Sequence, residues 1–323
     1  AILLAVALAG CAIALLSIGL VPSLIGLTIG VMIIGGANNF WHPAAFSYLA
    51  KRLPDNRGFA LSIHGLGANT GDALGPLAAG SLMVWIGWQG AAVANALPMF
   101  ALALMILVLM SRQEKSSEIA AAPALDLHAY FRGMVDMIKQ RAVLMLCLMA
   151  GFRTMTQNGI LIFLPMYLAD ALGFKGIMLG FVMSSMQIAG IISGPIAGTW
   201  SDKIGRRPIV LGGLAASTAV IITLTLVRHE AAFVGGVAML GFLLYAVRPV
   251  VHSWMMDLTP PGMNGSATSL MFGTQGAFKM GLPVFGGFIA DTWGLPTVFY
   301  LLAATMLAAN VVAVFLPRSQ VGS

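Results

Sequence analysis

Apolar stretches of twenty or more residues recur along the chain and are separated by short polar breaks. About 20 residues in a helix cross a hydrocarbon core of roughly 30 Å, and each backbone polar group inside lipid needs an internal partner. The stretches therefore predict membrane-spanning helices, whereas a β-barrel would show alternating segments of about ten residues. We expect ten spans, at residues 1–20, 24–49, 58–85, 88–110, 142–168, 177–200, 208–227, 231–256, 265–290 and 294–316.

The composition excludes a water-facing globule. Of the 323 residues, 59% are hydrophobic and 9% are charged, and the mean hydropathy is +0.92. Soluble domains have about 45–50% apolar and about 25% charged residues. Cys11 and Cys147 lie in apolar spans, which is typical of small buried side chains and indicates neither a disulfide framework nor a metal site. No nucleophile–base pair, phosphate-cradling loop or ATP-binding domain is evident, so we expect no enzyme activity and no cofactor.

Basic residues fall mainly on one side of the predicted membrane. The positive-inside rule makes that side cytoplasmic, and it places the C-terminus there as well. The pI near 9.6 is explained by this topology, so no nucleic-acid partner is expected. Only Lys175 and Arg228 fall in loops on the other side. The cytoplasmic residues are Lys51, Arg52, Arg57, Arg112, Lys115, Arg132, Lys139, Arg141, Lys203, Arg206, Arg207 and Arg318.

One long polar connection divides the chain. Residues 112–141 mix charges with Ser, Ala and Pro, and they predict a cytoplasmic linker between a four-helix bundle (1–111) and a six-helix bundle (142–323). The chain begins at Ala1 inside an apolar helix, without Met and without the basic region of a signal peptide. We therefore expect that the first half is incomplete.

The two halves match in parallel when the chain is compared with itself. At an offset of 206 residues Gly30, Pro43 and Pro54 meet Gly236, Pro249 and Pro260, and at 207 residues Gly58, Pro76 and Gly87 meet Gly265, Pro283 and Gly294. The offset places the loop that ends in Arg207 level with a position just before Ala1, so two further helices are expected upstream. Two parallel repeats of six helices, joined by a long linker, resemble the major facilitator superfamily. The resemblance implies an all-α polytopic membrane protein with that fold, in which ten of twelve transmembrane helices are present.

The segment GTWSDKIGRRP resembles the cytoplasmic loop motif of that superfamily, Gly-x-x-x-Asp-Lys/Arg-x-Gly-Arg/Lys-Arg/Lys. The resemblance implies a gating loop in which Asp202 faces the N-terminus of a helix of the opposite half, where the helix dipole stabilises a carboxylate. The partner helix would begin near Gly58. The alternative is that the basic residues only anchor the topology. The motif residues are Gly198, Asp202, Lys203, Gly205, Arg206 and Arg207.

A second segment, GDALGPLAAG, resembles the fifth-helix motif of drug:proton antiporters through Gly71, Gly75, Pro76 and Gly80, with Ala79 in place of one glycine. The alternative is an ordinary packing face of small residues. The strings at 41–52 and 58–77 further resemble fosmidomycin-resistance-type efflux proteins, which implies export and suggests a phosphonate. His64 and Asp72 depart from that pattern.

Ionisable residues lie inside four predicted spans, at Asp72, Arg153, Arg248 and Lys279. Each costs about 2.5–3.5 kcal/mol at mid-bilayer on insertion scales and marks a functional site by default. Polar residues accompany them at helical spacing, which is how a helix lines a cavity. We predict that all of these positions bind substrate or couple protons, and the accompanying residues are His64, Asn69, Gln157, Asn158, His252 and Gln275.

The repeat relates these charges to one another. Asp72 is the counterpart of Lys279, and His42 is the counterpart of Arg248. Asp72 and Lys279 are therefore predicted to form an ion pair across a cavity, made or broken as protons or substrate bind. The alternatives are a static structural pair, or Lys279 extending alone to the interface. His42, His64 and His252 are candidates to couple protons near neutral pH, and the more usual alternative for a membrane histidine is a hydrogen-bonded packing residue.

Together these features predict a secondary active transporter, monomeric, in a bacterial cytoplasmic (inner) membrane. Three bases against one acid favour proton-coupled efflux of a small anionic or zwitterionic compound by alternating access, because Arg binds carboxylate or phosphonate oxygens in pairs. A proton-coupled importer of organic anions is the first alternative, and a non-transporting membrane receptor is the second. The expected partners are a small-molecule substrate, protons and the lipid bilayer.

Overall fold

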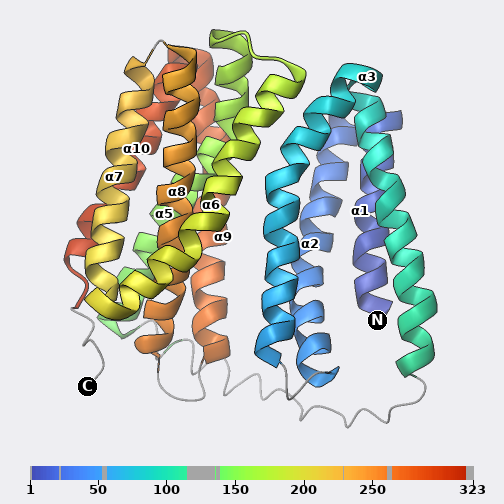
Figure 1. Ribbon diagram of the computed structural model, residues 1–323, viewed down its shortest axis with the longest axis horizontal. Coiled ribbons are helices and arrows are strands. Elements are labelled where there is room, and N and C mark those ends of the chain that lie inside the picture. The colour runs from blue at the N-terminus through green and yellow to red at the C-terminus, as the bar shows by residue number, and fades with distance from the viewer. Residues whose placement is uncertain are drawn as a thin grey trace. The chain divides into compact units, whose positions relative to one another are not determined.

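The structure is a computed structural model that describes residues 2–21, 23–52, 57–114, 135, 139–227, 229–259 and 264–317. These residues form helices and short connections, with no strand among them. The chain divides into two compact units, Ala1–Pro123 and Ala124–Ser323, drawn from blue to teal and from green to red in Figure 1. The all-helical prediction is confirmed. The predicted linker 112–141 lies mostly outside the described residues, so the predicted domain boundaries stay a prediction.

The first unit contains α1 (Ile2–Leu20), α2 (Leu24–Arg52) and α3 (Arg57–Glu114). Helix α1 packs against both α2 and α3. Helix α3 is interrupted at Gly87, whose φ of 69° and ψ of 175° are not helical, and glycine adopts a positive φ without the strain of a Cβ. The two arms of α3 run in opposite directions from this turn (Figure 1). Gly87 thereby separates the predicted spans 58–85 and 88–110.

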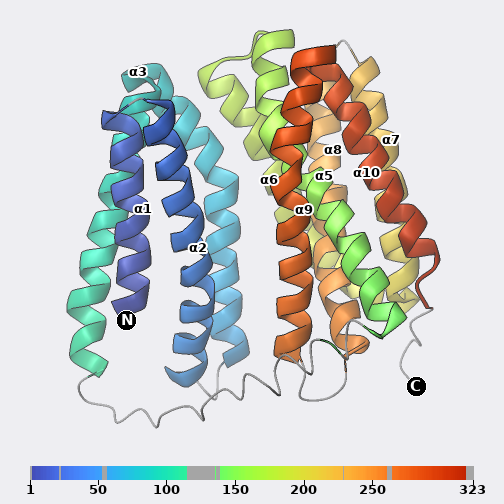
Figure 2. The ribbon, with the colours of Figure 1, turned by 180° about the vertical axis from the view of Figure 1, so that it is seen from behind.

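The second unit is a bundle of six described helices. Helix α6 packs along α8, α10 packs against α5 and α7, and α9 packs against α5, and the arrangement is seen from behind in Figure 2. The helices are α5 (Arg141–Ala171), α6 (Gly176–Ile204), α7 (Arg206–Leu226), α8 (Glu230–Asp257), α9 (Asn264–Trp293) and α10 (Leu295–Val314).

Glycines bring α6 and α8 into backbone contact. A Cβ on Gly241 would lie 2.1 Å from the carbonyl oxygen of Met186, and a Cβ on Gly190 would lie 2.6 Å from the ring of Tyr245. No other residue fits at Gly241 without a shift of backbone. Small residues of this kind let membrane helices approach closely, and van der Waals contact holds them together where lipid removes the hydrophobic drive.

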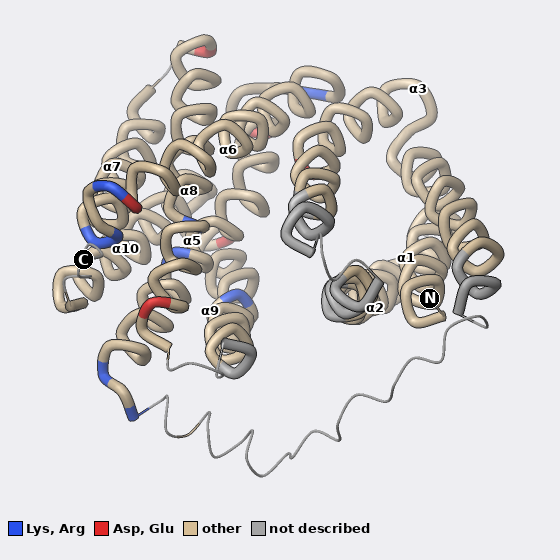
Figure 3. Tube along the Cα trace, turned by 60° about the horizontal axis from the view of Figure 1, so that its bottom comes forward, with Lys and Arg blue, Asp and Glu red and all other residues tan. Residues whose placement is uncertain are grey.

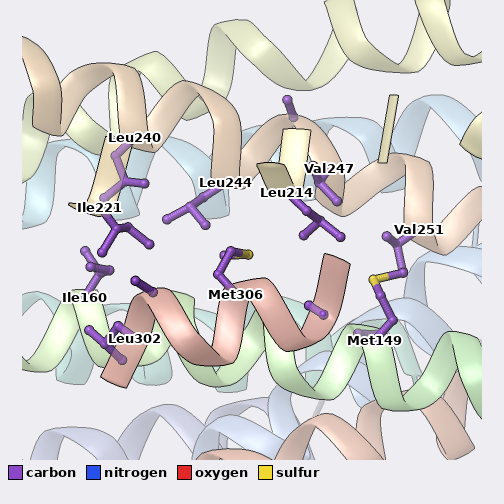
Figure 4. Packing of buried hydrophobic residues seen from close by; sticks show 14 of the residues in the cluster. Met149, Ile160, Leu214, Ile221, Leu240, Leu244, Val247, Val251, Leu302 and Met306 are labelled. Atoms are coloured by element: carbon purple, nitrogen blue, oxygen red, sulfur yellow. The ribbon is translucent and has the colours of Figure 1, made fainter. Parts of the chain in front are cut away.

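The core of the second unit lies between α5, α7, α8 and α10. Ile160, Leu214, Ile221, Leu240 and Leu302 are fully or almost fully buried there, and their side chains interdigitate (Figure 4). Large apolar side chains cover the outside, as expected for lipid contact; Trp85, for example, is 83% exposed in the first unit.

Six of the described helices are long and apolar enough to cross a membrane by length and composition. Helices α2, α5 and α9 fall outside this group, although each coincides with a predicted span. Polar positions interrupt α5 at Arg153, Gln157 and Asn158 and interrupt α9 at Gln275 and Lys279. Both of these less apolar helices of the second unit therefore carry candidate site residues, as does the more apolar α8 with Arg248 and His252.

Candidate functional site

Arg153 is the most deeply buried of the candidate site residues in the second unit. It lies within α5, and its side chain is only 4% exposed. One terminal nitrogen, Nη2, donates to Oε1 of Gln157 at 2.8 Å and to the backbone carbonyl of Leu244 on α8 at 2.5 Å. The Nε has no hydrogen-bond partner among the described residues. A buried charge that keeps a free donor is costly unless something else completes its shell.

Two further bases interact electrostatically with Arg153: Arg248 of α8 and Lys279 of α9. We call Arg153, Arg248 and Lys279 the mid-helix cluster. Arg248 and Lys279 are exposed within the second unit, whereas Arg153 is enclosed. Their charges are alike, so they raise each other's energy at short range in a medium of low dielectric.

Acidic residues do not neutralise the mid-helix cluster within the described part of the second unit. The described acids there lie at or near helix ends, and charged positions are sparse along the helices (Figure 3). These acids are Asp170, Asp202, Glu230, Asp257 and Asp291. The described ion pairs of this unit involve Arg206. The mid-helix cluster is therefore a concentrated positive charge that an anion would stabilise.

Polar side chains predicted from the sequence lie on the same helices as this cluster. His252 of α8 interacts electrostatically with Arg248 and Arg153, and its ring lies 5.4 Å from that of Phe272. Gln275 of α9 is buried, and Asn158 of α5 is half-buried. The structure thus brings Arg153, Gln157, Arg248, His252 and Lys279 into one region. Their role in binding substrate or coupling protons stays a prediction.

The candidates of the first unit lie on α3. His64 is half-buried, with its ring stacked on Trp41 at a centroid distance of 6.4 Å, whereas Asn69 and Asp72 are exposed within that unit. The predicted ion pair between Asp72 and Lys279 joins the two units and stays a prediction. The side chain of His42 lies outside the described residues.

The predicted gating loop forms a tight connection between α6 and α7. Helix α6 ends at Ile204, Gly205 has a φ of 94°, and α7 begins at Arg206. Arg206 donates to the hydroxyl of Ser201 at 2.7 Å, to the carboxylate of Asp202, and to that of Asp257 at 3.1 Å. We call Asp202, Arg206 and Asp257 the helix-end cluster.

Asp257 was missed by the sequence reasoning. It ends α8, 51 residues beyond Arg206, and no motif in the sequence connects the two positions. Arg207 makes a second contact that the sequence did not predict, donating to the carbonyl of Val314 at the end of α10 at 2.5 Å. A cation at a helix C-terminus satisfies its last carbonyl groups. The loop therefore joins the ends of α6, α7, α8 and α10. The predicted contact of Asp202 with a helix near Gly58 stays a prediction.

The antiporter-like motif lies in the first arm of α3. Gly71 and Gly75 are exposed, and a Cβ on either would meet nothing within 4 Å in the described structure. Pro76 lies inside the helix, and Gly80 is buried. Within the described first unit, Gly71 and Gly75 are thus open rather than closely packed, unlike Gly190 and Gly241.

Metal binding finds no support in the described residues. No group of three or more His, Cys, Asp or Glu side chains is placed there to hold an ion. Cys147 is buried, and Cys11 is partly buried.

The family comparison covers both units of the chain. The model of the Major Facilitator Superfamily matches residues 1–156 and 146–323. With two helical units and membrane-length apolar helices, the chain belongs to this superfamily of membrane transporters. It is accordingly an integral membrane protein, and the predicted superfamily and fold are confirmed.

Individual relatives match at low identity. "Multidrug resistance protein MdtG" of Proteus mirabilis (strain HI4320) is 24% identical over 306 residues, which cover 89% of this chain and 75% of the relative. "Uncharacterized MFS-type transporter YfnC" of Bacillus subtilis (strain 168) is 24% identical over 322 residues, covering 98% and 77%. The MdtG of Klebsiella pneumoniae (strain 342) is 30% identical over 162 residues, covering 48% and 39%.

Two solved structures are similar in fold. A bacterial homologue of the human lysosomal transporter Spinster, in an inward-facing and unoccupied conformation, has a TM-score of 0.75 and 15% identity, covering 97% of this chain and 80% of the other. A bacterial homologue of the iron transporter ferroportin, in an inward-facing state, has a TM-score of 0.69 and 17% identity, covering 90% and 71%. At these identities the likeness concerns the fold alone.

Proposed function

We propose that this transporter exports a small anionic or zwitterionic compound by alternating access, coupled to protons, across a bacterial cytoplasmic membrane. The observation that supports a negatively charged group on the substrate is the mid-helix cluster. In it, Arg153 is buried and its Nε has no hydrogen-bond partner in the described structure. A carboxylate or phosphonate group suits this arrangement because a guanidinium binds two oxygens at once.

Export, rather than import, is supported by the relatives and by the motif on α3. Several relatives carry the name "Multidrug resistance protein", and Gly71, Gly75, Pro76 and Gly80 resemble an antiporter motif. The side of the membrane is supported by Lys203, Arg206 and Arg207, which favour a cytoplasmic loop and with it a cytoplasmic C-terminus.

Proton coupling would use groups that gain or lose a proton as the compound binds and leaves. Asp72 is the one acid inside a predicted span, and His64 and His252 are the histidines among the candidate site residues. In this scheme a proton neutralises Asp72 in one state of the transport cycle, and the anionic compound neutralises the mid-helix cluster in the other.

The test is efflux from cells. The complete reading frame is expressed in a bacterium that lacks its own efflux pumps, and retention of a labelled phosphonate antibiotic is followed with and without a protonophore. Low retention that rises when the proton gradient collapses supports the proposal. Retention equal to the empty vector, with the protein present in the membrane, rejects that substrate, and gradient-driven uptake of a labelled organic anion would establish the importer instead.

A further inference from the structure

The contact between Arg153 and α8 lies near a proline inside that helix. Arg153 Nη2 donates to the carbonyl of Leu244. Pro249 lies inside α8, and because proline has no N–H, it donates no hydrogen bond within the helix. Membrane helices tolerate such prolines where neighbouring groups satisfy the freed backbone. Arg153 therefore contacts α8 five residues before Pro249.

The residue after Leu244 on α8, Tyr245, is in contact with α6. The ring of Tyr245 lies so close to Gly190 of α6 that a Cβ at position 190 would clash with it. Leu244 thus accepts a side-chain hydrogen bond from α5, and Tyr245 packs closely against α6. Arg153 can exchange the Leu244 carbonyl for another acceptor by a change of hydrogen bond alone, whereas the packing of Tyr245 against Gly190 can change only if side chains repack.

The guanidinium is also the group best prepared to receive an oxyanion. It is 4% exposed, its Nε is unpartnered in the described structure, and its Nη2 already divides its donation between Gln157 and Leu244. Neither acceptor is charged. An oxyanion is a stronger acceptor than an amide or backbone carbonyl, because hydrogen bonds between ionised groups are about twice as strong as neutral ones.

We propose that Arg153 exchanges the Leu244 carbonyl for a carboxylate or phosphonate oxygen of the transported compound, and that this exchange releases α8 to move at Pro249. Arg248 and Lys279 raise the local concentration of anions, whereas Arg153 converts binding into a change of α8. The inference rests on the proposed function in that it takes the bound compound to be the transported one.

Trp254 provides the readout, because it lies on α8 five residues beyond Pro249 and is fully buried. The purified protein in detergent is titrated with methylphosphonate and, separately, with acetate, and tryptophan fluorescence is recorded. The Trp254→Phe variant identifies the part of the signal that belongs to this residue. Binding of radiolabelled methylphosphonate is measured in parallel by equilibrium dialysis.

The inference makes separate predictions for the affinity for methylphosphonate and for the size of the Trp254 fluorescence change at saturation. Arg153→Lys keeps the charge but loses the fork, so we expect binding to weaken by about tenfold to a hundredfold, as for one lost charge-assisted hydrogen bond, and the Trp254 change at saturation to disappear. Arg248→Gln and Lys279→Gln remove exposed charges, so binding weakens by about threefold to tenfold while the saturating Trp254 change keeps its full size. Lys175→Gln, which removes an exposed charge before α6, leaves both quantities unchanged.

Three results would overturn the inference. Methylphosphonate could bind the wild type without changing Trp254, or Arg153→Lys could keep the full change, or neither probe could bind at all. Each of these leaves the cellular efflux assay untouched, so efflux that responds to the gradient would still support the proposed function. Loss of gradient-dependent efflux together with an intact Trp254 response would reject the function and leave an anion-responsive α8.

Discussion

Two groups of charged residues in the same bundle contrast in how their arginines are satisfied. In the helix-end cluster, Arg206 meets two carboxylates and a hydroxyl. In the mid-helix cluster, Arg153 donates to an amide and a backbone carbonyl but, among the described residues, to no carboxylate, and two more bases interact with it electrostatically. The first arrangement is complete in itself and fastens helices together. The second is incomplete without an anion, which is the property of a binding site.

Burial sharpens this contrast. The helix-end cluster is partly exposed, with Asp202 at 63% and Asp257 at 47% side-chain exposure, so water could have satisfied its charges at little cost. Arg153 is enclosed, where an uncompensated charge is expensive. The exposed charges of the helix-end cluster are neutralised and stabilise the ends of the helices. The buried charge of Arg153 is not neutralised by an acid among the described residues and stays available for a ligand.

The largest expected effect comes from supplying the missing acid to the mid-helix cluster. Gln157→Glu places a carboxylate at the position that already accepts from Arg153 at 2.8 Å. The internal acceptor then competes with the ligand, so we expect methylphosphonate affinity to fall by about tenfold to a hundredfold, from a charge-assisted hydrogen bond of about 1.5–3 kcal/mol. Equilibrium dialysis measures this loss.

The matched control for that variant adds the same charge elsewhere. Gln140→Glu lies just before α5 on an exposed residue and should change affinity by less than about twofold, because exposed charges are screened. Unchanged affinity in Gln157→Glu would mean that Arg153 does not face the ligand.

An intermediate effect is expected at Asp72, the acid that the internal repeat relates to Lys279. Asp72→Asn removes the one carboxylate inside a predicted span, so its charge and its capacity for a proton are both lost. We expect gradient-driven efflux to fall by about tenfold, corresponding to roughly 1.4 kcal/mol, and its dependence on pH between 6 and 8 to flatten. Efflux rates across this range provide the measurement.

Asp170→Asn controls for loss of an acid, since Asp170 is exposed near the end of α5. It should keep the wild-type rate and pH profile. If Asp72→Asn does the same, the proposed exchange between Asp72 and Lys279 is wrong.

The smallest effect is expected at the helix-end cluster and should appear in stability rather than binding. Arg206→Gln loses its two carboxylate partners and loosens α6, α7 and α8, so we expect the free energy of unfolding to fall by about 1–2 kcal/mol. High salt should reduce the difference because the pairs are partly exposed. Thermal unfolding in detergent measures both effects.

Lys203→Gln is the control within the same loop, because Lys203 is exposed and a surface substitution changes stability by about 0.5 kcal/mol or less. Methylphosphonate affinity should stay within about twofold of the wild type in Arg206→Gln. A larger loss would remove the distinction between the two clusters.

The fold could be predicted from the sequence because lipid leaves the backbone few choices. Each predicted span coincides with a helix or an arm of one, and Gly87 separates two spans where the turn occurs. Helix ends differ by a few residues, since polar residues beyond the apolar stretch, such as Arg52 and Glu114, still continue the helix. Length and hydropathy contain no information about those last turns.

The site could be predicted only in part. Arg153, Arg248 and Lys279 were found because a charge in an apolar span is conspicuous, and Gln157 was found because it lies one helical turn from Arg153. The carbonyl of Leu244 could not be found, because every residue has one and only the packing of α5 against α8 selects it. Asp257 was missed for a related reason: an acid at a helix end is ordinary until the fold brings Arg206 beside it.

The glycine contact between α6 and α8 has a mechanical consequence. At the contact of Gly241 with the carbonyl of Met186, no side chain lies between the two helices to absorb a shift. We therefore expect α6 and α8 to move together as one rigid body when the protein changes conformation. Spin labels placed on the two helices should keep a constant separation under conditions in which labels on α5 and α8 move apart.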